Sequence, residues 1–396
     1  MISVDEAVTR VAAAFKPLAA VQVDIGSAAG RVLAEDATAR LTQPPAAVSA
    51  MDGYAVRTAD VATVPVSLKV IGSAPAGHPF GETVGKSEAV RIFTGGVVPE
   101  GADTIVIQED TEAGGDTVLV KEAPRPSRHI RVAGLDFKQG DILLSAGHRL
   151  TARDVALLAA ADIPQVAVRR KPRVVIAATG DELFRPGEAH KPGGIVASSV
   201  YGLCALVEKW GGIPQDIGIL PDRADSIAGI TQHARDADVI VTLGGASVGD
   251  HDLVQKALGP KGFVLDFWKI AMRPGKPLIF GHLDGTPLLG LPGNPVSSYV
   301  CALLFLKPAV AAMLGETIEP NFSAYPLATD LPANDSRQDY IRARLVQTGG
   351  QTLVEPLPVQ DSSMQRALVE ADTLIVRAPH APAARMGDKV RVILLD

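Results

Sequence analysis

The sequence predicts a multidomain protein in which a central, doubly wound α/β domain lies between β modules. Residues 172–316 alternate continuous apolar strands, which end in glycine-rich turns, with helix-like stretches, and this is typical of a parallel sheet covered by helices. Residues 43–141 and the chain after Pro320 instead contain short apolar runs separated by turn residues, which predict small β domains. A length of 396 residues with 47% hydrophobic side chains is enough for several cores.

The first predicted element is a helix within residues 3–20, where apolar residues recur at helical spacing and Ser3 with Glu6 forms a capping box. A short extended piece over 21–25 and a turn at Gly26 follow. A second helix is predicted over 151–162, with Thr151 as its N-cap. We therefore expect a helical linker domain made of two segments, 1–43 and 141–169, with a β module inserted at 44–140.

The central domain is predicted to span residues 170–317. Strands are expected at 173–180, 238–245 and 287–293, and helices at 198–211, 225–237, 251–258 and 295–314. The predicted C-terminal β domain spans 318–396, with strands at 341–347, 351–358, 372–379 and 388–396.

Composition excludes several classes of protein. The net charge is −6, without a basic tail, which argues against a nucleic-acid partner. Cys204 and Cys301 are the only cysteines, too few for a disulfide framework or a thiolate zinc site. No signal peptide is visible, and the longest apolar region, Tyr299 to Leu314, is interrupted by Lys307-Pro308, so we expect no membrane span. The sequence predicts a soluble, cytoplasmic protein.

Four segments have more glycine and polar residues than folding requires: 49–55, 178–182, 244–252 and 291–297. The last two each connect a strand to a helix, where glycines and free N–H groups favour a phosphate. Asn294 and Pro295 suit the start of a helix. The alternative is that these are plain strand-to-helix turns. Neither segment is a P-loop or a GxGxxG motif, so nothing supports an NTPase or a Rossmann dehydrogenase.

A basic segment, 268–277, carries Lys269, Arg273 and Lys276 between apolar flanks and predicts an oxyanion site; the alternative is a solvated turn. Acidic side chains near the loops could hold Mg²⁺ or orient water, or could be turn and cap residues. These acidic residues are Asp52, Asp136, Asp181, Glu182, Asp222, Asp250 and Asp252.

Five motifs occur in order: SAMDGYAV, RIFTGGVVPEGADTIVIQED, GGASVGDHD, AMRPGKP and LPGNPVS. Together they resemble the molybdopterin molybdenumtransferases, the family that includes MoeA and the gephyrin E domain. The resemblance runs from about residue 3 to the end.

The resemblance implies an elongated, four-domain homodimer whose site is shared between subunits. It implies insertion of molybdenum from molybdate into the dithiolene of adenylated molybdopterin, with release of AMP and with Mg²⁺ as cofactor. Molybdopterin adenylyltransferase and maturation factors of molybdoenzymes are the partner proteins that it suggests.

The resemblance also assigns roles by position. The expected catalytic residues are Asp52, Asp136, Glu182, Asp222, Asp252, Lys269 and Arg273, and the expected metal ligands are Asp222, Asp250 and Asp252. The expected substrate-binding residues are Thr94, Thr179, Gly180, Asp181, Gly244, Gly245, Ser247, Gly249, Lys276, Pro292, Gly293, Asn294, Ser297, Arg342 and Ser363.

Two positions depart from the family pattern. Many relatives have lysine where this chain has Arg273, which replaces a point charge by a planar fork. Relatives often read QxSxxxxS in the C-terminal domain, whereas here Gln360 and Ser362 are followed by Ala367. These departures keep two alternatives open: a molybdopterin-binding carrier or scaffold without turnover, and a molybdopterin adenylyltransferase.

Overall fold

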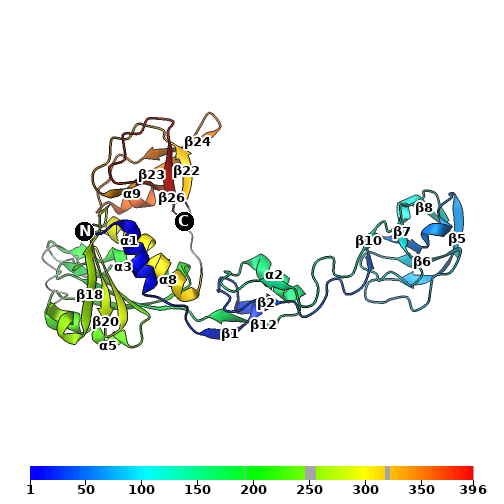
Figure 1. Ribbon diagram of the computed structural model, residues 1–396, viewed down its shortest axis with the longest axis horizontal. Coiled ribbons are helices and arrows are strands. Elements are labelled where there is room, and N and C mark those ends of the chain that lie inside the picture. Colours follow the sequence, from blue (N-terminus) through cyan, green and yellow to red (C-terminus); the bar gives the residue numbers. More distant parts are fainter. Residues whose placement is uncertain (191, 246–255, 317–321, 396) are drawn as a thin grey trace. The chain divides into compact units, whose positions relative to one another are not determined.

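The computed structural model describes residues 1–190, 192–245, 256–316 and 322–395 (Figure 1). Its contacts divide the chain into two compact units. The first unit comprises 1–21, 30–34 and 168–396, and the second comprises 22–29 and 35–167. Each unit has its own core, so they are described separately.

The second unit is built on a six-stranded sheet in the order β7-β4-β6-β5-β9-β8. These strands are β4 (Gly53–Val56), β5 (Val66–Ala74), β6 (Glu88–Ile92), β7 (Thr104–Ile107), β8 (Thr111–Gly114) and β9 (Thr117–Val120). All four residues of β4 are buried because β6 and β7 flank it and core clusters cover both of its faces. Shorter pairs extend the unit: β3 (Val48–Ser49) with β10 (Ile130–Arg131), and β2 (Ala37–Thr38) with β11 (Ile142–Leu144).

Helix α2 (Ala152–Ala160) begins at the predicted cap. The Thr151 side chain accepts from the Asp154 backbone, and the Asp154 carboxylate accepts from the Thr151 N–H, which completes a capping box. Asp154 also accepts a 2.9 Å hydrogen bond from Nε2 of His148. This bond, followed by the Thr151 hydroxyl, lowers the pKa of Asp154 to about 2.

Acidification is expected to loosen α2. The folded pKa of Asp154 lies below its unfolded value of about 4, so its stabilisation is present above about pH 4 and is lost as the pH falls through 2. Asp154→Asn should cost about 1 kcal/mol at neutral pH. Amide hydrogen exchange of α2 at pH 7 measures the effect of the substitution. Equal protection of α2 in the wild-type protein and in Asp154→Asn would contradict the prediction.

The first unit contains the α/β domain. Its six-stranded sheet has the order β16-β13-β17-β21-β20-β18. Four neighbouring strands are parallel: β16 (Ile213–Leu220), β13 (Arg173–Thr179), β17 (Val239–Leu243) and β21 (Thr286–Leu291). The continuation is antiparallel, through β20 (Pro277–Leu283) and β18 (Phe263–Lys269). The sheet is therefore mixed rather than wholly parallel, because Asp284 and Gly285, both with positive φ, form a tight turn between β20 and β21.

Helices cover both faces of this sheet, as predicted. On one face α1 (Val4–Ala13), α3 (Ser198–Lys209), α7 (Pro295–Cys301) and α8 (Lys307–Leu314) share one core, and α1 lies against α8 (Figure 1). On the other face α4 (Ala224–Ala228) and α5 (Thr231–Ala234) pack on the alternate residues of β13 and β17. Ser3 caps α1 by accepting from the Glu6 N–H.

The apolar run at the end of this domain forms the helix that was predicted over residues 295–314. Lys307-Pro308 does not interrupt the helix: α7 continues through a π-helical turn, Ala302–Leu306, into α8, giving 20 helical residues over Pro295–Leu314. This helix is long and apolar enough to cross a membrane. However, 67% of its most apolar window is buried inside the protein, as in the core helix of a folded domain.

The C-terminal β domain completes the first unit. Its sheet has the order β19-β23-β25-β26-β22, with β24 also paired to β23. The strands are β22 (Phe322–Pro326), β23 (Gln338–Thr348), β24 (Gln351–Pro356), β25 (Thr373–Arg377) and β26 (Lys389–Leu394). The edge strand β19 (Met272–Arg273) belongs to the basic segment and pairs in parallel with β23. The basic segment therefore joins the α/β domain to the C-terminal sheet. Two further strands, β1 (Ala20–Asp24) and β12 (Gln165–Arg169), pair with each other.

Candidate active site

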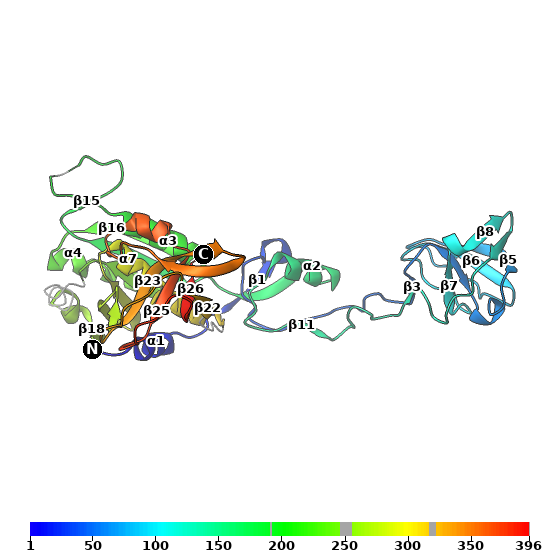
Figure 2. The same ribbon diagram turned by 90° about the horizontal axis from the view of Figure 1, so that it is seen from above.

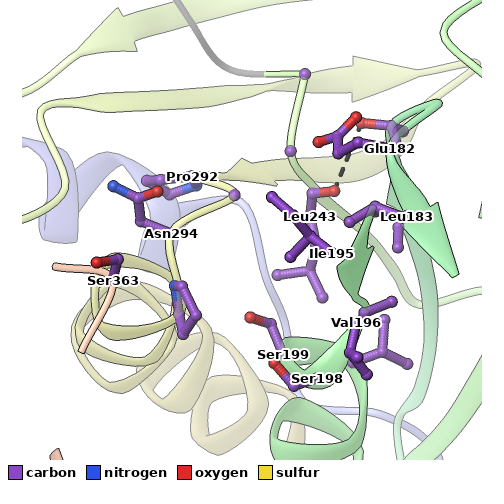
Figure 3. A pocket seen from close by; sticks show the side chains of 18 of the residues that line it. Glu182, Leu183, Ile195, Val196, Ser198, Ser199, Leu243, Pro292, Asn294 and Ser363 are labelled. Atoms are coloured by element: carbon purple, nitrogen blue, oxygen red, sulfur yellow. Dashed lines mark hydrogen bonds between the residues drawn. The ribbon is translucent and has the colours of Figure 1, made fainter. Parts of the chain in front are cut away.

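A cavity of about 490 Å³ lies at the carboxyl ends of β13, β17 and β21 (Figure 3). Ligands bind at this edge of open α/β sheets because parallel strands all end there and lead into loops. The lining comprises Ala178, Thr179, Glu182, Leu183, Ile195, Val196, Ala197, Ser198, Ser199, Val200, Asp222, Leu243, Gly244, Gly245, Pro277, Pro292, Gly293, Asn294, Pro295 and Ser363. Every one of these residues belongs to the first unit.

The turns that border the cavity require glycine. Gly244 has φ +92°, and a Cβ there would lie 2.6 Å from the carbonyl oxygen of Thr179. The Thr179 hydroxyl donates a long hydrogen bond, 3.5 Å, to the carbonyl oxygen of Leu243. The backbone after β17 can therefore approach β13 closely, and it leaves room for a ligand above both strands.

Two carboxylates face the cavity. Glu182 and Asp222 both line it, and Glu182 is exposed. Gly180 adopts φ +153°, and a Cβ there would lie 2.7 Å from Oε2 of Glu182. The glycine therefore lets the Glu182 carboxylate fold back over the end of β13. The backbone N–H of Asp222 donates to Oδ1 of Asp181 at 3.2 Å, which links the loops after β13 and β16.

The structure brings many of the predicted residues together. Those that line the cavity are Thr179, Glu182, Asp222, Gly244, Gly245, Pro292, Gly293, Asn294 and Ser363. Gly180 and Asp181 line a neighbouring depression of about 350 Å³. The predicted residues Ser247, Gly249, Asp250 and Asp252 lie outside the described residues.

Other predicted residues of the first unit do not line the described part of the cavity. They are Lys269, Arg273, Lys276, Ser297 and Arg342. Ser297 is buried within α7, and Lys276 is exposed after β19. The ammonium of Lys269 lies 3.6 Å from the ring centroid of Trp268, a cation–π contact.

Arg273 has a structural contact that the sequence did not predict. Its Nε donates to Oδ1 of Asp339 at 2.7 Å, its Nη2 pairs with Oδ2 of the same carboxylate, and its Nη1 lies 3.2 Å from Oδ2 of Asp335. Asp339 is buried, and its hydrogen bonds raise the pKa of Arg273. The guanidinium thus joins β19 to β23 as a bidentate ion pair, a geometry that lysine cannot provide.

Arg342 is a buried cation beside the cavity wall. It is only 1% exposed, and its burial lowers the pKa of the guanidinium. Its Nη2 donates to the carbonyl oxygen of Asp361 at 3.3 Å, two residues before Ser363, which lines the cavity. Its Nε has no hydrogen-bond partner in the described part of the chain. Because Arg342 does not line the described part of the cavity, this buried donor does not face the cavity in this structure.

Asp52, Thr94 and Asp136 belong to the second unit. Oδ1 of Asp52 accepts from the Thr94 N–H at 2.7 Å and from the Thr94 hydroxyl at 2.8 Å, and these bonds lower the pKa of Asp52. Gly53 is needed beside it, because a Cβ there would lie 2.0 Å from the carbonyl oxygen of Val106. Asp136 is exposed, and its N–H donates to the carbonyl oxygen of Gln43.

One wall of the cavity was missed from the sequence. Strand β15 (Ile195–Val196) pairs in parallel with β14 (Leu183–Phe184) at the edge of the domain (Figure 2) and leads directly into α3 through Ser198 and Ser199. Ile195 is 57% exposed and Val196 37% exposed, so both apolar side chains face open space. The sequence does contain a signal for this wall: the apolar pair Ile195-Val196 stands between Gly193-Gly194 and Ser198-Ser199. This is the same pattern of glycines beside a strand-to-helix connection that identified the other loops of the cavity.

A Mg²⁺ site needs several oxygen ligands close together. The described residues contain no group of three His, Cys, Asp or Glu side chains that could hold a metal. Two carboxylates, Glu182 and Asp222, do line one cavity, and such oxygen donors suit Mg²⁺ bound together with a substrate phosphate. These two carboxylates are therefore the residues of the described part that would hold Mg²⁺, and no third ligand group accompanies them there.

Comparison with known proteins covers nearly the whole chain. Residues 2–161 match the MoeA N-terminal region (domains I and II), residues 175–312 a probable molybdopterin binding domain, and residues 324–395 the MoeA C-terminal region (domain IV). The chain is 39% identical to a molybdopterin molybdenumtransferase of Nostoc, over 81% of this chain and 76% of that protein. It is 36% identical to that of Haemophilus influenzae, over 93% and 92% of the two chains.

Solved structures agree with this fold. A molybdopterin biosynthesis MoeA protein from Pyrococcus horikoshii superimposes with a TM-score of 0.87 at 29% identity, over all of both chains. Another structure of the Pyrococcus protein gives 0.85 at 30% identity, over 100% of this chain and 99% of that one. These matches confirm the predicted multidomain α/β plus β fold. The chain belongs to the molybdopterin molybdenumtransferase family, transferases of molybdenum cofactor biosynthesis.

Proposed function

We propose that this enzyme inserts molybdenum from molybdate into adenylated molybdopterin and releases AMP. The observation that carries the proposal is the cavity. It places the glycine-rich turns after β17 and β21 opposite two carboxylates, Glu182 and Asp222, at one sheet edge. Glycine-rich turns suit the phosphates of an adenylated substrate, and carboxylates suit the groups that assist cleavage of its anhydride.

The residues present suggest a division of labour. Gly244, Gly245 and Gly293 would let the backbone approach the phosphates, since a side chain at Gly244 would clash with β13. Glu182 would act as a general acid or base beside the anhydride of the substrate. Arg342 and Ser363 would bind the oxyanion molybdate: Ser363 lines the cavity, and the Arg342 guanidinium donates to the carbonyl oxygen of Asp361, two residues before Ser363. Positioning of two anions would then be most of the catalysis.

Mg²⁺ is proposed as the helper ion, held by Asp222 together with Asp250 and Asp252. Bound there, it would neutralise charge on the phosphates. Asp222 contributes a carboxylate to the cavity, while the other two residues lie outside the described part of the chain. We propose that Lys269 and Lys276 contribute positive electrostatic potential around the bound phosphates and molybdate.

A homodimer is part of the proposal. Asp52 and Thr94 form a hydrogen-bonded pair on the second unit, and we propose that this motif, together with Asp136, contributes to the site of the partner subunit. We also propose a cytoplasmic location. The long apolar helix is consistent with this because it serves as a core element.

The test is to incubate the purified protein with adenylated molybdopterin and Mg²⁺, with and without molybdate, and to measure AMP. We expect release that depends on molybdate. Tight molybdopterin binding without release would instead indicate a carrier, and adenylation of molybdopterin from ATP would indicate an adenylyltransferase.

A further inference from the structure

A short segment of the C-terminal domain, residues 360–365, forms a strap along the cavity wall. The strap is anchored at its start by the Gln360 carboxamide. Oε1 accepts from the Arg342 N–H at 3.0 Å, and Nε2 donates to the carbonyl oxygens of Arg342 at 2.9 Å and Leu357 at 2.8 Å. Both ends of the carboxamide are engaged, so the strap is fixed in register on β23.

The middle of the strap is also fixed. The Asp361 carboxylate accepts from the N–H of Ser363 at 2.8 Å and from its hydroxyl at 2.7 Å, and these bonds lower the pKa of Asp361. The carbonyl oxygen of Asp361 accepts from Arg342. The turn that places Ser363 in the cavity wall is therefore built from contacts within the C-terminal domain.

The far side of the strap reaches two helices of the α/β domain. The carbonyl oxygen of Ser362 accepts from the Val296 N–H at 3.0 Å, and its hydroxyl accepts from Nδ2 of Asn294 at 2.8 Å. Nε2 of Gln365 donates to the hydroxyl of Ser198 at 2.7 Å. Asn294 and Ser198 both line the cavity, on α7 and α3 respectively (Figure 3).

The N-termini of α7 and α3 have no side-chain caps of their own, and the strap contacts engage polar side chains there instead. Asparagine at an N-cap usually accepts from its own helix, yet the Asn294 side chain forms no such bond and is drawn to Ser362 instead. Helix α3 also lacks a side-chain cap, and the hydroxyl of its first residue, Ser198, is engaged by Gln365. Two polar groups of the cavity wall are therefore oriented by another domain rather than by their own helices.

We propose that Ser362 and Gln365 are positioning residues: they hold Asn294 and Ser198 toward the ligand, so that the C-terminal domain completes the nucleotide site of the α/β domain. The inference rests on the proposed function, because the ligand is the nucleotide part of an adenylated substrate. Neither strap residue lines the described part of the cavity, so each acts through the side chain that it holds.

The test is the affinity for AMP, measured by calorimetry on the full-length protein. Ser362→Ala and Gln365→Ala should each weaken AMP binding about five-fold, the effect of one neutral hydrogen bond. Ser362→Thr keeps the hydroxyl and should restore binding to within about two-fold. In turnover, the alanine variants should raise KM while kcat stays within about two-fold, since no reacting group is changed.

A matched control is available in the same domain. Nε2 of Gln347 donates to the hydroxyl of Thr352 at 2.8 Å, the same type of bond as Gln365–Ser198, on the exposed hairpin of β23 and β24. Gln347→Ala should leave AMP binding unchanged. Wild-type AMP affinity in both strap variants would overturn the inference alone. Absence of AMP binding by the wild-type protein would overturn the proposed function and the inference with it.

Discussion

Arg273→Ala is expected to destabilise the first unit by about 2 kcal/mol and to lower its unfolding temperature by roughly 4–8 °C. The reason is that the Asp339 carboxylate, on a residue only 6% exposed, would lose the guanidinium that binds it in a bidentate pair. The effect is placed below that of a fully buried pair because the Arg273 side chain is 48% exposed. Differential scanning calorimetry measures the change.

Controls separate this structural role from the predicted catalytic one. Arg273→Lys keeps the charge but cannot form the fork, so its stability should lie between wild type and the alanine variant. Asp339→Asn should destabilise the protein comparably. If Asp339→Asn and Arg273→Ala both retain wild-type kcat at a temperature where they are folded, Arg273 is structural. If Arg273→Ala keeps its stability but loses turnover, the structural account of this residue is wrong.

Glu182→Gln is expected to lower kcat about 100-fold, the range for losing a general acid or base. The Glu182 side chain lines the cavity, and its carboxylate approaches Gly180 so closely that a Cβ on this residue would lie 2.7 Å from Oε2. Affinity for AMP should change little, because glutamine has nearly the same shape. Rapid-quench measurement of AMP formation gives kcat separately from binding.

Two companion variants sharpen the result. Gly180→Ala should also reduce kcat, since its Cβ would displace the Glu182 carboxylate without removing it. Glu208→Gln, on the exposed end of α3, is the matched control and should be silent. Loss of AMP affinity equal to the loss of kcat in Glu182→Gln would make this carboxylate a binding group rather than a catalytic one.

The sequence predicted the sheet edge well. Apolar strands that end in glycine-rich turns identified β13, β17 and β21, and parallel strands bring their carboxyl ends together whatever their order. This is why Thr179, Gly244 and Asn294 lie in one cavity although more than a hundred residues separate the first from the last.

The role of Arg273 in the basic segment was harder to predict because the carboxylate that it binds is distant in the sequence. Asp339 lies 66 residues after Arg273, on a strand of another domain, and no local pattern announces the ion pair. The cations of 268–277 therefore suggested an anion site, whereas the structure gives Arg273 a carboxylate of its own chain. The prediction of a wholly parallel sheet was wrong because strands and helices alternate regularly elsewhere in this domain. The tight turn at Asp284-Gly285 interrupts that alternation and makes β20 and β21 antiparallel.

The most direct measurement follows AMP and molybdenum in one reaction. The protein is mixed with adenylated molybdopterin, Mg²⁺ and molybdate, and both the released AMP and the molybdenum bound to pterin are quantified. The account predicts equal amounts of the two products and no AMP release when molybdate is omitted. AMP release that is indifferent to molybdate, or molybdenum-free pterin after complete AMP release, would contradict it.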